Sequence, residues 1–369
     1  MPTTTPPIDV WGPEPIAPML AKAVTEIPEG MAYEPKWDGF RCIVQRTGDR
    51  MVLWSRGAKD LTVYFPELVS SLAAALPERC VVDGEIVIIG DSRLQFERLQ
   101  ERIHPAESRI RKLSSEIPAD FIAFDLLAVG DEDLTERGAA ERRRRLVDAL
   151  GEGTDRVHLT PQTTDLETAR QWFVAFEGAG LDGIIAKPHD VAYLPDKRAM
   201  FKIKHKRTAD VVVMGFRLHK NSTEDKPLLG SLQLGLFDDA GVCQFIGVAS
   251  SFPTARRAEL ATTLGAQVVN PGDPLWDEHP WSRHAAEWDR RPGAISRWSG
   301  SQGRVEQPGN LIMPLLVVEI SYDYFEGTRL RHNGQFVRWR PDRDPGSCTY
   351  DQIEIPTTMA IESVLGSIG

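Results

Sequence analysis

The sequence predicts an α+β protein in which a mixed first domain is followed by a domain made mainly of strands. In the first half, short apolar runs typical of strands alternate with segments that repeat apolar residues at helical spacing, as in 65–75. In the second half, strand-like runs dominate at 211–216, 230–237 and 243–249, with one helical segment near 254–264. Several short strands and one helix are typical of a small barrel, with the OB fold among the candidates.

The change in pattern near residue 207 divides the chain. We expect a disordered Pro/Thr-rich lead-in over residues 1–17, the mixed domain over 18–207 and the barrel domain over 208–369. Residues 270–312 are rich in Pro, Gly, Trp and Arg, and we expect an ordered insertion there, either functional or simply packed on the barrel. Its tryptophans are Trp276, Trp281, Trp288 and Trp298.

Composition restricts the class of protein. Hydrophobic residues make up 41% of the 369-residue chain, enough for more than one core. The four cysteines show no Cys-x-x-Cys spacing, so neither a zinc site nor a disulfide framework is indicated, and a reducing compartment is expected. We find no signal peptide and no membrane-spanning apolar run, so we expect a cytoplasmic protein without a membrane partner. The formal net charge of −10 argues against nucleic acid as a partner unless basic side chains gather on one face.

The most informative stretch of the chain is Tyr33-Glu34-Pro35-Lys36-Trp37-Asp38-Gly39-Phe40-Arg41. It predicts a strand carrying Lys36, a tight turn at Asp38-Gly39 and a second strand over 40–46. A lysine held on a rigid strand, desolvated and near other cations, loses its proton more readily and becomes a nucleophile. The alternative is a solvent-exposed hairpin lysine, and a pattern of four residues does not decide between the two.

Other charged residues could complete a nucleotide pocket around this lysine. Arg41 and Arg56 lie at strand ends beside turns, where a guanidinium can hold phosphate or ribose. Glu85 lies in an apolar strand, and because a lone charge in a core is costly, we expect it to point into a polar cleft. Phe124 either stacks on a base or belongs to the core.

A second charged segment follows. Asp182 comes directly before a short strand that ends at Lys187. Lys202 and Lys204 are two residues apart on a strand and therefore share one face. Two lysines on one face repel each other unless they point at an anion such as a triphosphate, although lysine is also common on exposed edge strands.

Taken in this order, the segments resemble the motifs of ATP-dependent DNA ligases, a family of the covalent nucleotidyltransferase superfamily. Besides the Lys36 stretch, the matching segments within about residues 18 to 355 are Ser55-Arg56-Gly57, Asp83-Gly84-Glu85, Phe121 to Leu127, Asp182 to Lys187, Lys202 to Lys204 and Arg340-Pro341-Asp342-Arg343. The C-terminal part is similar to that of the short bacterial ligases, ligase C and the ligase module of ligase D. The resemblance implies an antiparallel-sheet nucleotidyltransferase (adenylation) domain followed by an OB-fold β-barrel domain.

The resemblance also implies a reaction. Lys36 would take AMP from ATP and release pyrophosphate, the AMP would pass to a 5′-phosphate at a DNA break, and a 3′-hydroxyl would then displace it. Mg²⁺ would be needed, with Mn²⁺ as an expected substitute. Glu34 would contact the adenine through its backbone, and Phe124 would stack on it. The other implied roles are phosphate, ribose or AMP binding by Arg41, Arg56, Glu85, Lys187, Lys202 and Lys204, metal binding by Glu85 and Asp182, and orientation of pyrophosphate by Arg340, Asp342 and Arg343.

Three positions depart from the family pattern. Asp182 replaces the usual glutamate, Phe201 a common tryptophan and Arg343 the usual lysine. The alternative functions are those of an RNA ligase or capping-type nucleotidyltransferase, or of a non-enzymatic OB-type nucleic-acid-binding protein. The expected partners are ATP, nicked or broken duplex DNA and a repair polymerase or end-binding protein. We expect the chain to act as a monomer, in DNA repair.

Overall fold

The structure is a computed structural model that describes residues 9–12, 14–151, 153–284, 291–292, 309–354 and 356–366. The chain divides into two compact units, one formed by Met1–Lys204 together with Pro356–Gly369 and the other by His205–Ile355. The sequence predicts a boundary at residue 207 and assigns everything beyond it to the second domain. In the structure, the C-terminal segment instead belongs to the first unit.

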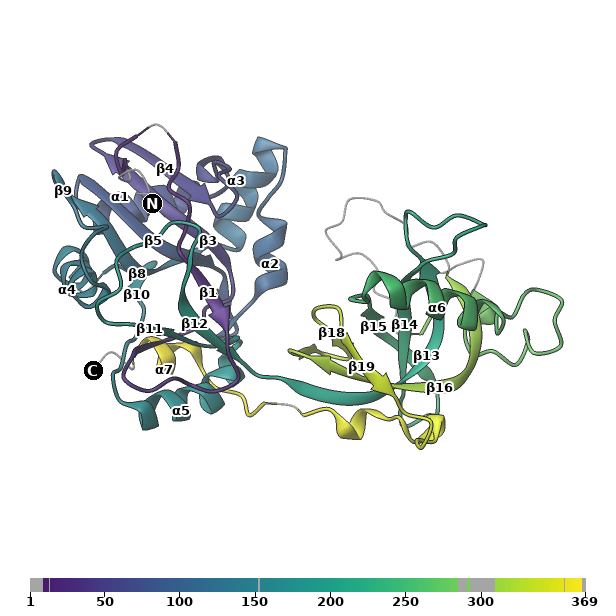
Figure 1. Cartoon of the computed structure of the whole chain (residues 1–369). Helices are drawn as coiled ribbons and strands as arrows, with labels where there is room; N and C mark the ends of the chain where they lie inside the picture. The colour runs from purple at the N-terminus through teal and green to yellow at the C-terminus, as the bar shows by residue number, and fades with distance from the viewer. Residues whose placement is uncertain are drawn as a thin grey trace. The chain divides into compact units, whose positions relative to one another are not determined.

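The first unit contains two main sheets, and most of their neighbouring strands are antiparallel (Figure 1). The smaller sheet has the order β1-β12-β11-β2, with β1 parallel to β12. Its strands are β1 (Leu20–Ala23), β12 (Arg198–Lys204), β11 (Gly183–Lys187) and β2 (Ala32–Pro35). The antiparallel-sheet class predicted for this part of the chain is confirmed.

The larger sheet has the order β10-β8-β5-β3-β4, with β9 beside β8 and with β10 parallel to β8. Its strands are β10 (Val157–Leu159), β8 (Asp120–Val129), β5 (Arg79–Val87), β3 (Phe40–Thr47), β4 (Arg50–Ser55) and β9 (Glu132–Asp133). A separate two-stranded ribbon is formed by β6 (Ile89–Gly90) and β7 (Arg93–Leu94). The central strands β5 and β8 are buried along almost their whole length, which explains why their sequences are mainly apolar around the acidic residues Asp83, Glu85 and Asp125.

Helices cover both sheets of the first unit. They are α1 (Pro66–Ala75), α2 (Phe96–Glu101), α3 (Glu107–Glu116), α4 (Ala139–Leu150), α5 (Leu166–Ala175) and α7 (Ile361–Leu365). Leu68 and Leu72, one turn apart on α1, pack into the core of the larger sheet. Trp172 on α5 packs into the core of the smaller sheet together with Ile361 and Val364 of α7. These two fully buried side chains explain why the C-terminal segment belongs to the first unit.

The N-terminal segment is ordered earlier than the sequence predicts. Val10 is buried in a cluster with Met19, Ile43 and Val81, and Trp11 packs against the same cluster. The guanidinium of Arg79 lies 4.4 Å from the ring centroid of Trp11. Residues 9–12 are therefore held by apolar contacts that their Pro/Thr-rich surroundings conceal, whereas the first eight residues of the predicted lead-in lie outside the described residues.

The second unit is built on one five-stranded antiparallel sheet with the order β15-β14-β13-β16-β19. Its strands are β13 (Arg207–Leu218), β14 (Leu229–Phe237), β15 (Cys243–Ala249), β16 (Asn310–Tyr322) and β19 (Gln335–Trp339), with a small ribbon of β17 (Phe325–Glu326) and β18 (Arg329–Leu330). The edges β15 and β19 approach each other at an isolated bridge, where the Gly334 amide donates to the Val248 carbonyl at 2.9 Å.

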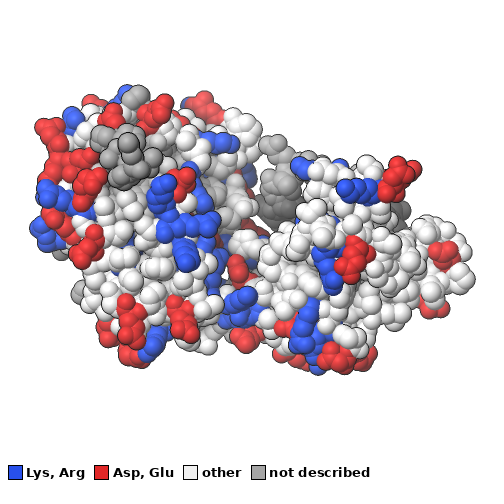
Figure 2. Space-filling model, viewed as in Figure 1, with Lys and Arg blue, Asp and Glu red and all other residues white. Residues whose placement is uncertain are grey.

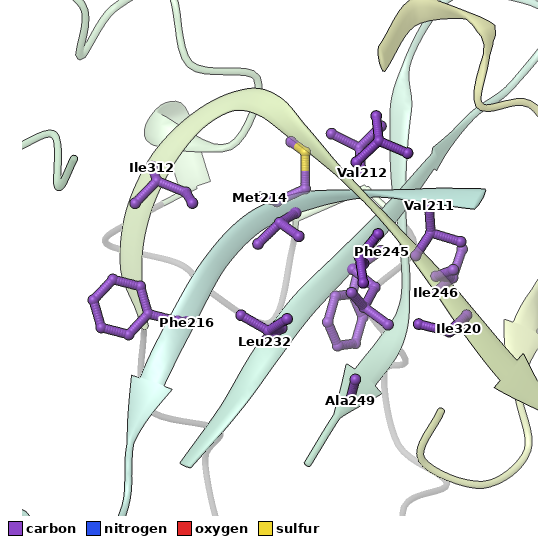
Figure 3. Close-up of a cluster of buried hydrophobic side chains, with 14 of the residues drawn as sticks. Val211, Val212, Met214, Phe216, Leu232, Phe245, Ile246, Ala249, Ile312 and Ile320 are labelled. Carbon is purple, nitrogen blue, oxygen red and sulfur yellow. The ribbon is translucent and has the colours of Figure 1, made fainter. Parts of the chain in front are cut away.

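Side chains from these strands point into one apolar core (Figure 3), which includes Met214, Phe216 and Phe245. The helix α6 (Thr254–Gly265) adds Leu260 and Leu264 to it.

The Trp-rich segment predicted at 270–312 is partly described. Trp281 is fully buried, and its indole N–H donates to the Cys243 carbonyl at 2.8 Å. The Nε2 atom of His279 lies within hydrogen-bond distance of the Met214 and Ile312 carbonyls. This part of the segment therefore packs on the sheet, which is one of the two predicted alternatives. Trp288 and Trp298 lie outside the described residues. None of the described helices is long and apolar enough to cross a membrane.

Candidate active site

Lys36 directly follows β2, where the chain leaves the smaller sheet for the larger one. Its backbone is held on both sides, since the Lys36 amide donates to the Gly183 carbonyl at 2.8 Å and the Asp182 amide donates to the Lys36 carbonyl at 3.1 Å. Gly39 directly precedes β3. It leaves no room for a side chain, because a Cβ atom there would lie 2.1 Å from the Ile86 carbonyl oxygen. The sequence predicts a strand that carries Lys36 and a tight turn at Asp38-Gly39, but β2 ends at Pro35, the chain only bends at Gly39, and β2 and β3 belong to different sheets. Lys36 therefore lies on a connection between the two sheets that is fixed by backbone hydrogen bonds.

The Lys36 side chain borders a cavity of about 250 Å³ that lies entirely within the first unit. The cavity brings together most of the residues predicted for nucleotide binding: Glu34, Lys36, Arg41, Arg56, Glu85, Phe124, Lys187 and Lys202. They come from β2, β3, β5, β8, β11 and β12 and from the end of β4, so both sheets contribute. The cavity is also lined by apolar residues, among them Met19, Leu20, Ile185 and Met200.

Two further predicted residues lie beside this cavity. Asp182 accepts from the Lys36 Nζ at 2.7 Å, and the Lys204 Nζ lies 3.1 Å from the same carboxylate oxygen. Burial acts to raise the pKa of Asp182, but the attraction of Lys36 and Lys204 outweighs it and holds that pKa well below its usual range. Asp182 is therefore an ionised carboxylate that is shared by two lysines.

The arginine on β3 is fixed by a carboxylate that we did not single out from the sequence. The Arg41 guanidinium makes two hydrogen bonds of 2.6 Å to the fully buried Asp83, and the Tyr193 hydroxyl donates to Asp83 at 2.6 Å. The guanidinium also lies 4.4 Å from the ring centroid of Phe124. Because Asp83 and Glu85 are two residues apart on β5, both lie on the face of the sheet that carries Arg41.

Glu85 is a half-buried carboxylate in the cavity wall. Its Oε1 accepts from the Gly39 amide at 3.1 Å. Burial raises its pKa to about 7, against the attraction of Arg41 and Lys36. A carboxyl group with this pKa changes its charge near neutral pH, which is uncommon outside functional sites.

The surroundings of Lys202 indicate that the ligand of the cavity is an anion. Burial lowers its pKa, and the neighbouring cations Lys204, Lys36, Arg56 and Arg198 lower it further. Such a concentration of positive charge is unfavourable without an anion, and a nucleotide phosphate would neutralise it. On the face shown in Figure 2, Lys and Arg side chains also gather into a patch on the first unit, so the net acidity of the chain is not spread evenly.

No group of three or more His, Cys, Asp and Glu side chains in the described part of the chain is arranged to hold a metal by itself. This observation is compatible with Mg²⁺, which usually keeps several waters and binds through one or two carboxylates plus substrate phosphates. Glu85 and Asp182 are suitable donors of that kind.

The second unit contains the three residues predicted to orient pyrophosphate, which are Arg340, Asp342 and Arg343. The Arg340 guanidinium donates to Asp210 at 2.8 and 2.9 Å and to Asp342 at 2.9 to 3.2 Å. The Arg343 Nε lies 3.8 Å from Asp210. The hydrogen bonds from Arg340 lower the pKa of Asp342 to about 2. Arg340, Asp342 and Arg343 thus form one ionic cluster around Asp210.

Three residues that matter for the geometry were missed from the sequence. Asp83 lies within the quoted motif, and its spacing of two from Glu85 could have indicated a shared face. Tyr193 and Gln162 lie in irregular segments with no recognisable pattern, and they reach the site only through the fold.

Two mainly antiparallel sheets that enclose a cavity of nucleotide size, with a fixed lysine and several cations at its wall, define the class of covalent nucleotidyltransferases. Residues 18–204 match the family model of the ATP-dependent DNA ligase domain. The chain therefore belongs to the ATP-dependent DNA ligase family, as the sequence motifs predict. Use of ATP and a covalent adenylate intermediate come with this family.

The relatives of the chain agree with this assignment. DNA ligase C of Mycobacterium tuberculosis is 51% identical over 358 residues, which cover 95% of this chain and 97% of that protein. DNA ligase C1 of Mycolicibacterium smegmatis is 43% identical over 363 residues, with the same coverage. Among solved structures, a Lig E DNA ligase has a TM-score of 0.53 at 17% identity, covers 88% of this chain and 100% of its own, and supports the fold alone.

Proposed function

We propose that this protein seals 5′-phosphate/3′-hydroxyl breaks in duplex DNA and that AMP is carried on Lys36 during the reaction. The observation that carries the proposal is the position of the Lys36 amine, at the wall of a cavity lined by Arg41, Arg56 and Lys202 and 2.7 Å from Asp182. Lys36 directly follows β2, and its backbone is fixed by two hydrogen bonds to the segment Asp182-Gly183. Relatives of the DNA ligase C type support DNA as the acceptor.

The reaction would proceed in three displacements. The Lys36 amine attacks the α-phosphorus of ATP, the bond to pyrophosphate breaks, and a phosphoramide bond to AMP forms as the attacking nitrogen loses a proton. An oxygen of the DNA 5′-phosphate then attacks the same phosphorus and releases Lys36. Finally, the 3′-hydroxyl attacks the activated 5′-phosphate, and AMP leaves as the phosphodiester forms. Each step is dominated by charge on phosphoryl oxygens, which the arginines and lysines of the cavity would neutralise.

We assign the remaining residues as follows. Phe124 and Glu34 hold the adenine, Arg41 and Arg56 hold AMP or the 5′-phosphate, and Lys187, Lys202 and Lys204 contact the phosphates. Mg²⁺, when bound, supplies charge neutralisation on the transferring phosphate, with Glu85 and Asp182 as its protein donors and Mn²⁺ as an expected substitute. We also infer that the second unit is an OB-type barrel, because its five-stranded sheet closes on itself at the bridge between Ala249 and Gly334.

The direct test of the proposed function is incubation with α-³²P-labelled ATP and Mg²⁺, followed by a denaturing gel. A covalent label on the protein, chased onto the 5′ end of a nicked duplex and then released as AMP on sealing, is the expected result. A label that transfers to a nick in RNA but not in DNA would favour an RNA ligase. Labelling by GTP instead of ATP would favour a capping-type enzyme.

We expect Arg340 to act only in the first step, the formation of lysyl-AMP. Arg340→Ala removes the centre of the cluster around Asp210, and we expect lysyl-AMP formation to fall roughly 100-fold, the scale of losing one charged donor at a transferring phosphate. Sealing of DNA that is already adenylylated involves no pyrophosphate and should change far less. Arg338→Ala is the control, since Arg338 is an exposed neighbour that pairs with Glu319. Equal losses in both steps would assign Arg340 to DNA binding.

Glu85 should produce a pH dependence of stability. Its pKa is about 7 in the folded protein against an ordinary 4.5, so between these values the folded state keeps a proton that the unfolded state has lost. Stability is therefore reduced as the pH rises through this window, by on the order of 2 kcal/mol. Glu85→Gln, which can keep the bond from Gly39, should gain stability over wild type at pH 8 but not at pH 4. Urea unfolding at the two pH values measures the difference, and a gain independent of pH would contradict the assignment.

A further inference from the structure

Behind the Glu34 side of the cavity runs a loop that follows β10 and does not itself line the cavity. The loop is joined to β2 by two backbone hydrogen bonds, from the Tyr33 amide to the Thr163 carbonyl at 2.8 Å and from the Thr163 amide to the Tyr33 carbonyl at 3.0 Å. The next residue of β2 is Glu34, and the preceding residue of the loop is Gln162. The backbone pairing therefore places Gln162 beside Glu34, although they are 128 positions apart.

The Glu34 carboxylate is buried and is held at both oxygens. Gln162 Nε2 donates to Oε1 at 2.8 Å, and Lys187 Nζ lies 2.8 Å from Oε2. Lys187 also donates to the Phe124 carbonyl at 3.1 Å and lies 5.1 Å from the centroid of the Phe124 ring. A single network thus fixes both the carboxylate and the ring at this end of the cavity, and Gln162 is its member outside the cavity wall.

An ionised carboxylate offers only acceptors, so a ligand group that faces Glu34 must be a hydrogen-bond donor. Adenine carries an amino group at position 6, which donates, whereas hypoxanthine and guanine carry an oxo group there, which only accepts. This inference rests on the proposed function, because it takes ATP as the ligand of the cavity. It assigns the adenine contact to the Glu34 side chain, whereas the resemblance of the sequence implies the Glu34 backbone. With one bond already made at each oxygen, the direction of the remaining lone pairs of Glu34 depends on those two donors.

We propose that Gln162 is a positioning residue that sets the base preference of the enzyme by holding Glu34 toward the 6-amino group. Among the described residues, Gln162 supplies the side-chain donor for Oε1, and without it the carboxylate is free to turn toward Lys187. The Glu34 oxygen that accepts from the 6-amino group is then displaced, while Lys36 and the phosphate-binding cations stay in place. Loss of Gln162 should therefore weaken the choice of base more than the chemistry of AMP transfer.

The test compares the efficiency of covalent nucleotidyl transfer from ATP, from purine riboside triphosphate, which lacks the 6-amino group, and from inosine triphosphate. In Gln162→Met, which keeps the length of the side chain but has no donor, the preference for ATP over purine riboside triphosphate should fall roughly tenfold, as expected for one hydrogen bond to a charged group. Efficiency with purine riboside triphosphate should stay near that of wild type. In Gln162→Glu, two adjacent carboxyl groups would share a proton, so the preference should move toward inosine triphosphate.

Thr163→Ala is the matched control. It alters the same loop, where the Thr163 hydroxyl accepts from the Asp165 amide at 3.1 Å, but leaves the Gln162 donor intact, and it should keep the wild-type base preference. Equal losses with ATP and purine riboside triphosphate in Gln162→Met would overturn the proposal and leave Gln162 a support of the loop. A wild-type enzyme that is labelled equally well by both nucleotides would also overturn it. Failure of every nucleotide to label wild type would instead overturn the proposed function.

Discussion

Lys36→Ala is expected to abolish covalent labelling by α-³²P-ATP while the protein stays folded. The label requires an amine at this position, and alanine supplies no nucleophile. Stability should change by only about 1 kcal/mol, because the lost ion pair is partly exposed and Asp182 keeps its second partner, Lys204, at 3.1 Å. A denaturing gel for the label and urea unfolding for stability measure the two effects separately.

Two further variants separate nucleophile from charge. Lys36→Arg keeps a cation beside Asp182 but has no nucleophilic amine, so it should also be unlabelled. Lys204→Ala removes the other cation beside Asp182 and keeps Lys36, so labelling should be slower but present. Lys36→Ala should also retain sealing of a nick that is already adenylylated, since the last displacement breaks no bond to the lysine. A label that persists in Lys36→Ala would place the nucleophile elsewhere, with Lys202 in the same cavity as the first candidate.

The parts of the site that the sequence predicts well are those in which chemistry and local geometry coincide. The Lys36 stretch needs a glycine because of the carbonyl beside Gly39, and Asp83-Gly84-Glu85 needs one because a Cβ atom at Gly84 would lie 2.2 Å from the Phe121 ring. These requirements leave short patterns that can be recognised. The strand that follows the Lys36 stretch, predicted over 40–46, is found as β3 at Phe40–Thr47.

What could not be predicted depends on contacts between distant segments. Asp83 fixes Arg41 only because β5 lies beside β3, and Gln162 meets Glu34 only through a loop paired with β2. The packing of α7 on the first unit depends on Ile361 and Val364, two apolar residues in a short helix with no local signal for where it docks. The periodicity within one segment does not indicate such pairings. The sequence therefore predicts the residues that line the site better than the residues that hold them in place.

The run Arg142 to Arg145 shows the same limitation. On the sequence it is best explained as a solvated helix face, because its spacing wraps around the helix. In the structure Arg144 is exposed, but Arg142 is fully buried, and it donates to Asp125 at 2.8 and 3.0 Å and to the Arg137 and Val191 carbonyls. Burial of this charge is tolerated because Nε, Nη1 and Nη2 of the guanidinium each donate to at least one of these groups.

Arg142→Ala is therefore expected to destabilise the first unit strongly, by about 3 to 5 kcal/mol, because it leaves the buried Asp125 carboxylate without its partner. Arg144→Ala on the same helix is the matched control. Arg144 makes only exposed pairs with Glu141 and Asp148 at 3.8 and 3.6 Å, and its loss should cost less than about 0.5 kcal/mol. Urea unfolding of both variants gives the comparison.

A second variant distinguishes the unpaired charge from lost packing. Replacing both partners, Arg142→Met with Asp125→Leu, removes the buried charge altogether and should recover a large part of the stability lost in Arg142→Ala. Full recovery is not expected, since the Arg137 and Val191 carbonyls still lose their donor. If the double variant is as unstable as Arg142→Ala, the destabilisation comes from these carbonyls and from packing against Tyr193, whose ring centroid lies 5.7 Å from the guanidinium. If Arg142→Ala and Arg144→Ala are equally stable, the buried ion pair does not stabilise the fold.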